Sequence, residues 1–142
     1  MSGFYDKYMI ITLVKFAQAV SKRRKKFTFF DIGANVGYYS MLSPKLNSSC
    51  TVFAFEALPL SFSYLEKNII LNKFKSRVFA HNILLADKVI NANFFIPLGN
   101  QSNASMLNVS KTNSFKKIIM KTSTLDLWNL KNNQKPDFIK CD

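Results

Sequence analysis

Apolar residues recur along the chain with two different periods, and the change of period predicts where helices and strands lie. Residues 4–20 carry apolar side chains three or four positions apart, which is the spacing of an amphipathic helix. Four short runs rich in aromatic and β-branched residues follow, at 27–32, 51–55, 77–86 and 136–142. Near-continuous apolar runs of this kind are typical of strands buried in a parallel sheet. The pattern therefore predicts an α/β fold built on such a sheet.

Helices are predicted between these strands. One begins at Gly37, and Pro44 should keep it short or kink it, because proline interrupts the hydrogen-bond ladder of a helix. Another begins at Pro59, a residue suited to the first helical turn, and ends near Asn72. The side chains expected to be buried are Tyr38, Tyr39, Met41 and Leu42 in the first helix and Phe62, Leu65 and Ile69 in the second, with Tyr64 or Leu71 beside them.

The segment between the third and fourth predicted strands departs from this alternation. Residues 91–98 alternate enough to form a strand, and residues 117–121 have the composition of a returning strand, so an inserted antiparallel strand pair is expected. A turn at Gly99-Asn100 and a polar loop over 101–113 should connect the two. Residues 124–128 are expected to start a short helix.

Net charge narrows the classes of partner without naming one. The chain has 142 residues, which suits one domain, and 20 Lys and Arg against 8 Asp and Glu give a net charge of +12. Such an excess can attract nucleic acid or an acidic membrane surface, although a solvated, lysine-rich surface is the simpler explanation. We divide the chain into an N-terminal amphipathic helix with a basic linker, 1–26, and a domain over 27–142. We expect that helix to pack against the sheet. The alternative is that it contacts a membrane surface, because the basic run 22–26 follows it.

Secretion and membrane insertion are not indicated. The apolar run from Met9 to Val20 is too short to span a bilayer and contains Lys15. Its basic residues follow the apolar part, which is the reverse of the order in a signal peptide. The two cysteines, Cys50 and Cys141, are too few for a disulfide scaffold and are expected to be buried free thiols. These features favour a reducing, cytoplasmic setting.

The stretch FTFFDIGANVGYY, residues 27–39, carries the clearest indication of a ligand site. A strand runs into Asp31 and then into Gly33-Ala34-Asn35-Val36-Gly37, an order typical of a strand, a tight turn and a helix start. Gly33 permits a positive φ, and neither Gly33 nor Gly37 has a Cβ that would keep a ligand away. A ligand would lie beyond the carboxyl end of the strand, over the N–H groups of the helix start. The alternative is a structural strand-turn-helix that binds nothing.

The charge around this loop favours one kind of nucleoside. The glycines are spaced G-x-x-x-G, so neither the dinucleotide pattern G-x-G-x-x-G nor the triphosphate pattern G-x-x-x-x-G-K-[ST] occurs. Asp31 leads directly into the loop, which suits a ligand with positive charge and amine donors. S-adenosylmethionine carries a sulfonium, an ammonium and a carboxylate but no phosphate. The loop therefore points to S-adenosylmethionine as the cofactor.

Acidic residues lie at the ends of the predicted strands. Asp31, Glu56 and Asp142 lie at the ends of the first, second and fourth predicted strands, and Asp87 lies at the end of the third. Because the carboxyl ends of parallel strands meet at one edge of a sheet, the four carboxylates are expected to converge there. Glu56 lies about 25 positions after Asp31, close to the spacing at which a second-strand acid accepts both ribose hydroxyls. His81, the only histidine, is expected to pack or to face solvent rather than to take part in catalysis.

Five stretches match a known sequence pattern: FDIGANVGYYS, VFAFEALPLSFSYLEKNIILN, LLAD, TLDLW and DFIKCD. Together they resemble the FkbM-type family of S-adenosylmethionine-dependent methyltransferases over residues 27–142, and D-I-G-A-N-x-G-Y is the most specific of the matches. The resemblance implies a Rossmann-like class I methyltransferase sheet. It also implies transfer of a methyl group to oxygen on a small molecule, such as a sugar or glycan hydroxyl.

The resemblance implies roles for individual residues. The methionine end of the cofactor would be held by Asp31, Gly33, Asn35 and Gly37, with Ala34 in the same loop. Glu56 would take the ribose, and Asp87 would lie near the adenine. Asp142 matches the Asp that opens the family's D-x-E-G motif and is the one candidate general base. We assign no residue of the chain to a metal site.

The chain departs from the family pattern in two places. Ala57 stands where the family commonly has proline, which this chain delays to Pro59. The sequence stops at Asp142, before the expected Glu-Gly, so we expect a sheet that is incomplete at its C-terminus and a fragment that can be inactive as it stands. Two other functions stay open: a basic nucleic-acid-binding module and a nicotinamide-dependent oxidoreductase on the same sheet. Nucleic acid is the less expected partner, because no RNA-recognition signature accompanies the lysines.

Overall fold

The computed structural model describes residues 7–23, 26–98 and 115–142, which belong to two compact units. The first unit is Met1–Asn82 with Gln134–Asp142, and the second is Ile83–Asn133. The predicted turn at Gly99-Asn100 and the loop over 101–113 lie outside the described residues. In the part of the chain that is described, no helix has the length and apolar character needed to cross a membrane.

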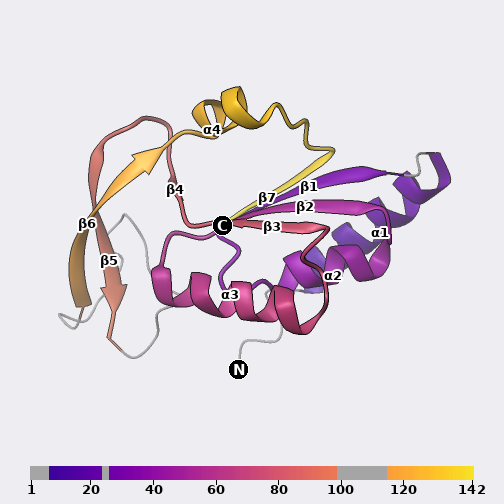
Figure 1. Ribbon diagram of the computed structural model, residues 1–142, viewed down its shortest axis with the longest axis horizontal. Coiled ribbons are helices and arrows are strands. Elements are labelled where there is room, and N and C mark those ends of the chain that lie inside the picture. Colours follow the sequence, from indigo (N-terminus) through magenta and orange to yellow (C-terminus); the bar gives the residue numbers. More distant parts are fainter. Residues whose placement is uncertain (1–6, 24–25, 99–114) are drawn as a thin grey trace. The chain divides into compact units, whose positions relative to one another are not determined.

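A four-stranded parallel sheet forms the centre of the first unit (Figure 1). Its strands are β1 (Phe27–Ile32), β2 (Cys50–Phe55), β3 (Val78–His81) and β7 (Phe138–Cys141). They lie in the order β3-β2-β1-β7, and each neighbouring pair is parallel. The first, second and last predicted strands are therefore confirmed. Because β1 lies between β2 and β7, the carboxyl ends of these three strands meet at one edge.

Three helices share one hydrophobic core with this sheet: α1 (Lys7–Arg23), α2 (Tyr38–Leu46) and α3 (Pro59–Leu71). The core is built from Leu13 and Ala17 of α1, Phe27 and Phe29 of β1, Val52 and Ala54 of β2, and Leu65 and Ile69 of α3, among others. Burying a leucine or phenylalanine contributes about 1.5–3 kcal/mol, so this set accounts for the packing of helices on sheet. The amphipathic N-terminal helix is confirmed.

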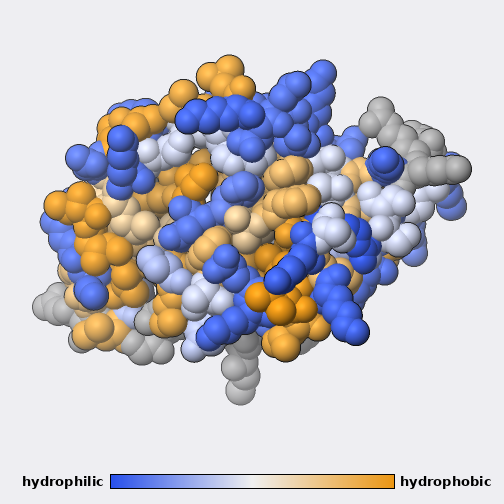
Figure 2. Space-filling view, in the orientation of Figure 1, coloured by the Kyte–Doolittle hydropathy of each residue, from blue (hydrophilic) through white to orange (hydrophobic). Residues whose placement is uncertain are grey.

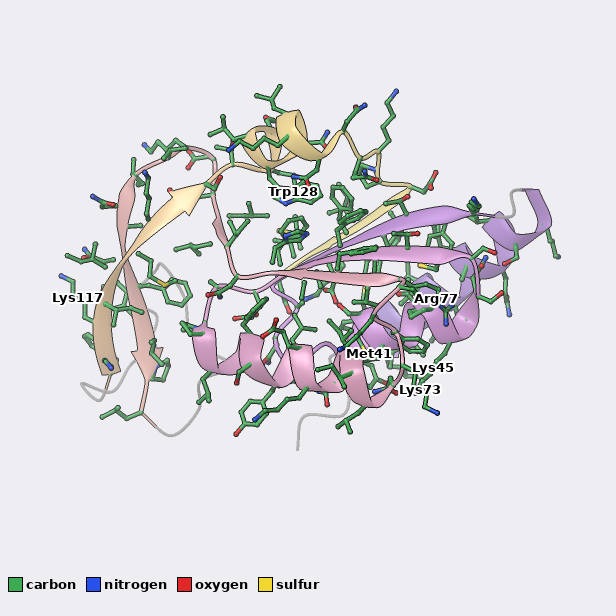
Figure 3. The ribbon with its side chains drawn as sticks, viewed as in Figure 1. Met41, Lys45, Lys73, Arg77, Lys117 and Trp128 are labelled. Carbon is green, nitrogen blue, oxygen red and sulfur yellow. The ribbon has the colours of Figure 1, made fainter. Side chains whose placement is uncertain are left out.

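The helix ends follow the predicted signals, but three apolar side chains are more exposed than expected. Pro59 occupies the first turn of α3, and the short helix α2 ends two residues after Pro44. Arg77 donates from Nη1 to the carbonyls of Pro44 and Ser48, at 3.0 and 2.8 Å, and so links the end of α2 to the start of β3 (Figure 3). The residues expected in the core that are exposed are Tyr38, Tyr64 and Leu71. These residues lie outside the apolar face that each helix packs against the core.

The third predicted strand, 77–86, is wrong as a continuous element. β3 ends at His81, and β4 (Leu84–Leu85) pairs with a strand of the second unit. Between β3 and β4, Nδ2 of Asn82 donates to the carbonyls of Glu56 and Ala57, at 2.8 and 3.0 Å. These hydrogen bonds lie where the pairing of β3 with β2 ends. Asp87 therefore follows β4 and does not end a strand of the parallel sheet.

The second unit holds β4, β5 (Asn91–Pro97), β6 (Phe115–Ser123) and α4 (Leu125–Asn132), with strand order β4-β6-β5. β5 and β6 are antiparallel, so the inserted pair is confirmed, as is the short helix. Oγ1 of Thr122 accepts the N–H of Ile90 at 2.8 Å and donates to the carbonyl of Lys88 at 2.6 Å. Oγ1 of Thr124 caps α4 by accepting the N–H of Leu127 at 3.1 Å.

The two cysteines differ from each other. Both are free thiols, as predicted, and Cys50 is buried. Burial raises the pKa of Cys50 to about 12, which makes this thiol unreactive. Cys141 is exposed, so the prediction of burial is wrong for this residue. Cys141 is out of phase with Phe138 and shares the exposed face of β7 with Ile139.

Candidate functional site

The loop between β1 and α2 is held by the end of β2. The N–H groups of Gly33 and Ala34 both donate to the carbonyl of Phe55, at 3.0 and 2.9 Å. The N–H of Asn35 donates to Oε2 of Glu56 at 2.7 Å. Since Phe55 is the last residue of β2 and Glu56 follows it, the loop lies across the ends of β1 and β2.

The loop requires three residues with left-handed backbone conformation. The φ angles are 70° at Gly33, 52° at Asn35 and 92° at Gly37, and asparagine is among the few residues with a side chain that adopt this region readily. The predicted positive φ at Gly33 is confirmed. A Cβ on Gly33 would lie 3.1 Å from Cβ of Asp142, and one on Gly37 would lie 2.5 Å from Cδ1 of Leu65. The missing Cβ atoms thus make room for protein atoms, and the expected room for a ligand stays a prediction.

Glu56 is buried and uses both carboxylate oxygens to hold backbone. Oε2 accepts the N–H of Asn35, and Oε1 accepts the N–H of Leu58 at 2.9 Å. The carbonyl of Glu56 is held in turn by Asn82 at 2.8 Å. A carboxylate oxygen can accept two hydrogen bonds, so each oxygen keeps one acceptor position. Glu56 can therefore hold the loop and accept donors from a ligand at the same time.

Asp31 is fully buried, and protein groups surround its carboxylate. Oδ2 accepts a hydrogen bond from Oγ of Ser40 at 2.6 Å, and Oδ1 lies 3.6 Å from Nζ of Lys140. The strand register places Lys140 of β7 directly opposite Asp31 of β1. Burial raises the pKa of Asp31, while the Lys140 charge and the Ser40 hydrogen bond oppose that rise. Asp31 is 0% exposed, so its carboxylate contacts protein groups and not solvent.

Lys140 links the loop to the end of β7. Its Nζ donates to the carbonyl of Gly33 at 2.9 Å and lies 3.1 Å from Oδ2 of Asp142. The ring of Tyr39 lies with its centroid 5.6 Å from the same nitrogen. Sequence reasoning missed this lysine. The available signal was that Lys140 is in phase with Phe138, and so on the face of β7 that packs on the core.

Seven of the eight predicted site residues lie in the first unit, at one edge of its sheet. These are Asp31, Gly33, Ala34, Asn35, Gly37, Glu56 and Asp142. The carboxylate of Asp142 is 80% exposed, whereas those of Asp31 and Glu56 are buried. Asp87 belongs to the second unit, so its predicted place near the other acids stays a prediction. His81 ends β3 and stacks on Phe55 at 5.4 Å between centroids, in agreement with the packing role predicted for it.

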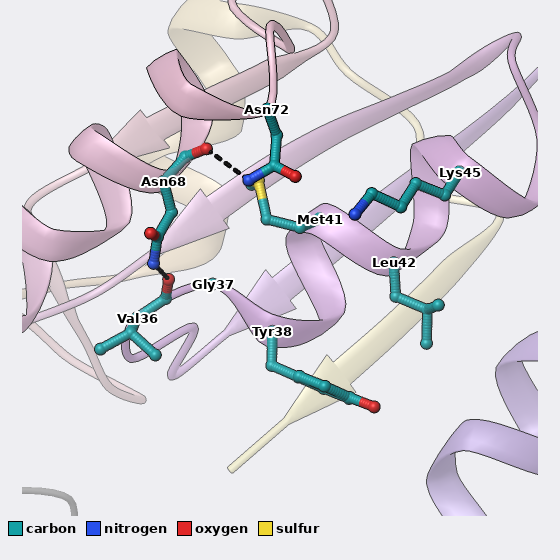
Figure 4. A pocket seen from close by; sticks show the side chains of 8 residues that line it. All are labelled: Val36, Gly37, Tyr38, Met41, Leu42, Lys45, Asn68 and Asn72. Carbon is teal, nitrogen blue, oxygen red and sulfur yellow. Dashed lines mark hydrogen bonds between the residues drawn. The ribbon is translucent and has the colours of Figure 1, made fainter.

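A pocket of about 300 Å³ lies on the helix side of the same loop (Figure 4). Its lining residues come from the loop, α2, α3 and the residue that caps the end of α3: Val36, Gly37, Tyr38, Met41, Leu42, Lys45, Asn68 and Asn72. Nδ2 of Asn68 donates to the carbonyl of Val36 at 2.7 Å, and Nδ2 of Asn72 donates to the carbonyl of Asn68 at 2.8 Å. None of the strand-end acids lines this pocket, so it is separate from the edge where they lie.

A parallel α/β sheet with a glycine-bearing loop after its first strand and an acid after its second is a Rossmann-like fold of the class I methyltransferase type. Residues 31–142 match the family model described as the methyltransferase FkbM domain. This match covers more than half of the chain, and the chain belongs to the FkbM methyltransferase family. Membership of this family implies S-adenosylmethionine as the methyl donor.

Solved structures resemble part of the chain. TYW2 from P. horikoshii, in complex with MeSAdo, is 29% identical with a TM-score of 0.40, over 51% of this chain and 26% of that one. A putative caffeoyl-CoA O-methyltransferase from Staphylococcus aureus is 21% identical with a TM-score of 0.44, over 50% and 34%. Human methyltransferase 10 domain containing protein is 18% identical with a TM-score of 0.45, over 51% and 37%. The chain thus aligns with well under half the length of each. No curated protein matches the sequence.

Proposed function

We propose that this chain is the cofactor-binding part of an S-adenosylmethionine-dependent methyltransferase that acts on oxygen of a small molecule, with a sugar or glycan hydroxyl as the acceptor. One observation carries the proposal: Glu56 holds the glycine loop through Asn35 at 2.7 Å and still has acceptor capacity on both oxygens. A nucleoside bound at this edge would meet a fixed loop and a fixed carboxylate together.

The residues present suit this cofactor in their chemistry. Glu56 would accept the ribose hydroxyls, and the loop Gly33-Ala34-Asn35-Val36-Gly37 would carry the methionine end. Asp31 would contribute through the loop, because its buried carboxylate is engaged by Ser40 and Lys140. Asp87 near the adenine is the remaining part of this proposal. Bound S-adenosylmethionine would supply an activated methyl group to an acceptor oxygen.

The protein's own contribution to transfer would be alignment and proton removal. Holding two reactants in line is worth about 7–11 kcal/mol of the barrier in well-oriented systems. Asp142 is the candidate base, since its carboxylate is exposed and Lys140 holds it at 3.1 Å. It would take the proton from the acceptor hydroxyl as the oxygen attacks the methyl group.

Calorimetric titration with S-adenosylhomocysteine tests the cofactor assignment. Glu56→Gln should weaken binding at least tenfold, because hydrogen bonds to a charged group contribute about 1.5–3 kcal/mol. Glu66→Gln is the matched control, since Glu66 lies exposed on α3 and should leave binding unchanged. Circular dichroism of both variants separates lost binding from lost folding. Equal affinity in Glu56→Gln and wild type would remove the ribose assignment, and a wild-type chain that binds no S-adenosylhomocysteine would refute the proposal for this chain.

The rival functions receive less support. Family membership argues against a nicotinamide-dependent oxidoreductase. Hydrophilic and hydrophobic residues are interspersed on the face shown in Figure 2. A nucleic-acid-binding module stays the less expected alternative, because no RNA-recognition signature accompanies the lysines. Leu13 and Ala17 anchor α1 in the core, so we assign this helix a structural role before any contact with a membrane surface. The two free cysteines fit the cytoplasmic setting that we propose.

A further inference from the structure

Lys140 is a lysine whose ammonium is directed into the protein. Four protein oxygens surround Nζ: the carbonyls of Gly33 and Ile32 at 2.9 and 3.4 Å, Oδ2 of Asp142 at 3.1 Å, and Oδ1 of Asp31 at 3.6 Å. The side chain is 8% exposed. Nζ donates hydrogen bonds to the two carbonyls, and the two carboxylates are its ion-pair partners. Lys140 therefore acts on the loop through the groups that it holds.

A charged residue at this position requires an explanation, because lysine is rarely buried unless it is paired. Phe138, two residues earlier on the same face of β7, packs on the core, and an apolar residue at position 140 would continue that pattern. Removing an ammonium from water is costly, and the cost is offset only by charge and hydrogen bonds. Asp31 provides the buried charge, Asp142 provides an exposed one, and Gly33 accepts the shortest hydrogen bond.

The peptide group between Gly33 and Ala34 is held from both sides. Its carbonyl oxygen accepts from Lys140 on β7, and its N–H donates to the carbonyl of Phe55 on β2 at 2.9 Å. The loop that follows β1 is thus fixed to both neighbouring strands. We propose that Lys140 is a positioning residue for the cofactor loop, which orients the Gly33-Ala34 peptide and the Asp142 carboxylate and neutralises Asp31, so that Asp31 supports the loop rather than contacting the cofactor.

This inference rests on the proposed function for its effect on binding, and three variants separate its parts. Lys140→Met keeps an unbranched side chain, shorter by one heavy atom, and removes the charge and the donors. Asp31→Asn with Lys140→Met removes both buried charges, so it should restore folding but not the hydrogen bond to Gly33. Lys135→Met is the control, because Lys135 is an exposed lysine shortly before β7.

Affinity for S-adenosylhomocysteine and the urea midpoint are measured for each variant. Lys140→Met should bind about tenfold more weakly and unfold at lower urea, because it leaves Asp31 buried without its cation. The double variant should recover the midpoint and remain about tenfold weaker in binding, while Lys135→Met matches wild type in both. Recovery of both properties in the double variant would mean that Lys140 is only a counter-ion, and wild-type affinity in Lys140→Met would equally overturn the proposal.

Amide hydrogen exchange gives a readout that does not depend on cofactor binding. The N–H of Ala34 should exchange faster in the double variant than in wild type, because its peptide is no longer held from the β7 side. Unchanged exchange at Ala34 would overturn the positioning role. If wild type fails to bind S-adenosylhomocysteine while Ala34 exchange responds as expected, the proposed function fails and the role of Lys140 in the loop stands.

Discussion

Replacing Gly37 by alanine should destabilise the first unit through two separable effects. Gly37 has a φ of 92°, and a side chain in left-handed backbone conformation costs about 1–2 kcal/mol. The new Cβ would also lie 2.5 Å from Cδ1 of Leu65, which is fully buried and must move. Overpacking of this kind costs about 1–3 kcal/mol. The sum, about 2–5 kcal/mol, is a large part of the roughly 5–15 kcal/mol that stabilises a typical domain.

A double-mutant cycle measured by urea denaturation separates the two effects. Leu65→Ala alone should cost about 2–5 kcal/mol, because it leaves a cavity in the core. It also removes the atom that Gly37→Ala would strike, so the combined variant should lose about 1–3 kcal/mol less than the sum of the single losses. Leu71→Ala is the control for truncating leucine on α3, since Leu71 is 76% exposed and should change stability by under about 0.5 kcal/mol.

Two results would refute this reasoning. A Gly37→Ala variant within about 0.5 kcal/mol of wild type would mean that neither the backbone strain nor the contact with Leu65 is present. Strict additivity in the cycle would show that the contact costs nothing and that the whole effect lies in the backbone.

Three further predictions concern titration, thiol reactivity and the second unit. The pKa of Asp31 is raised in the folded state, so folding favours its protonated form. As pH rises from about 4 through this titration, wild type should therefore lose stability relative to the Asp31→Asn variant. The measurement is the urea midpoint of both proteins against pH, and the two midpoints should converge or cross. A difference that is flat with pH would contradict the assignment. A thiol reagent should modify Cys141 in the native protein and reach Cys50 only on unfolding, because burial raises the pKa of Cys50 to about 12; modification of both at equal rates would be inconsistent with the fold. Thr122→Val should destabilise the second unit by about 1–3 kcal/mol, since the N–H of Ile90 loses the hydroxyl at 2.8 Å, whereas Thr124→Val should lose only a helix cap worth about 1 kcal/mol.

Elements defined by their own residues could be predicted from the sequence. The strand 27–32 and the start of α3 at Pro59 agree with the structure, because burial on both faces and the geometry of proline act over a few neighbouring residues. The positive φ of Gly33 follows in the same way from a tight turn between a strand and a helix. The glycine loop and Glu56, and with them the family, were therefore open to sequence reasoning.

Features that depend on contacts between distant residues could not be predicted. The run 77–86 has the composition of one strand, but the amide of Asn82 binds the carbonyls after β2 and ends the ladder at His81. The phase of Lys140 with Phe138 indicates the core face of β7, but only the register of β7 against β1 places Lys140 opposite Asp31 and within hydrogen-bond distance of the carbonyl of Gly33. Local pattern determines which segments become strands, because it reflects neighbours in the chain. Which side chains meet across those strands is decided by register, which brings together residues more than a hundred positions apart.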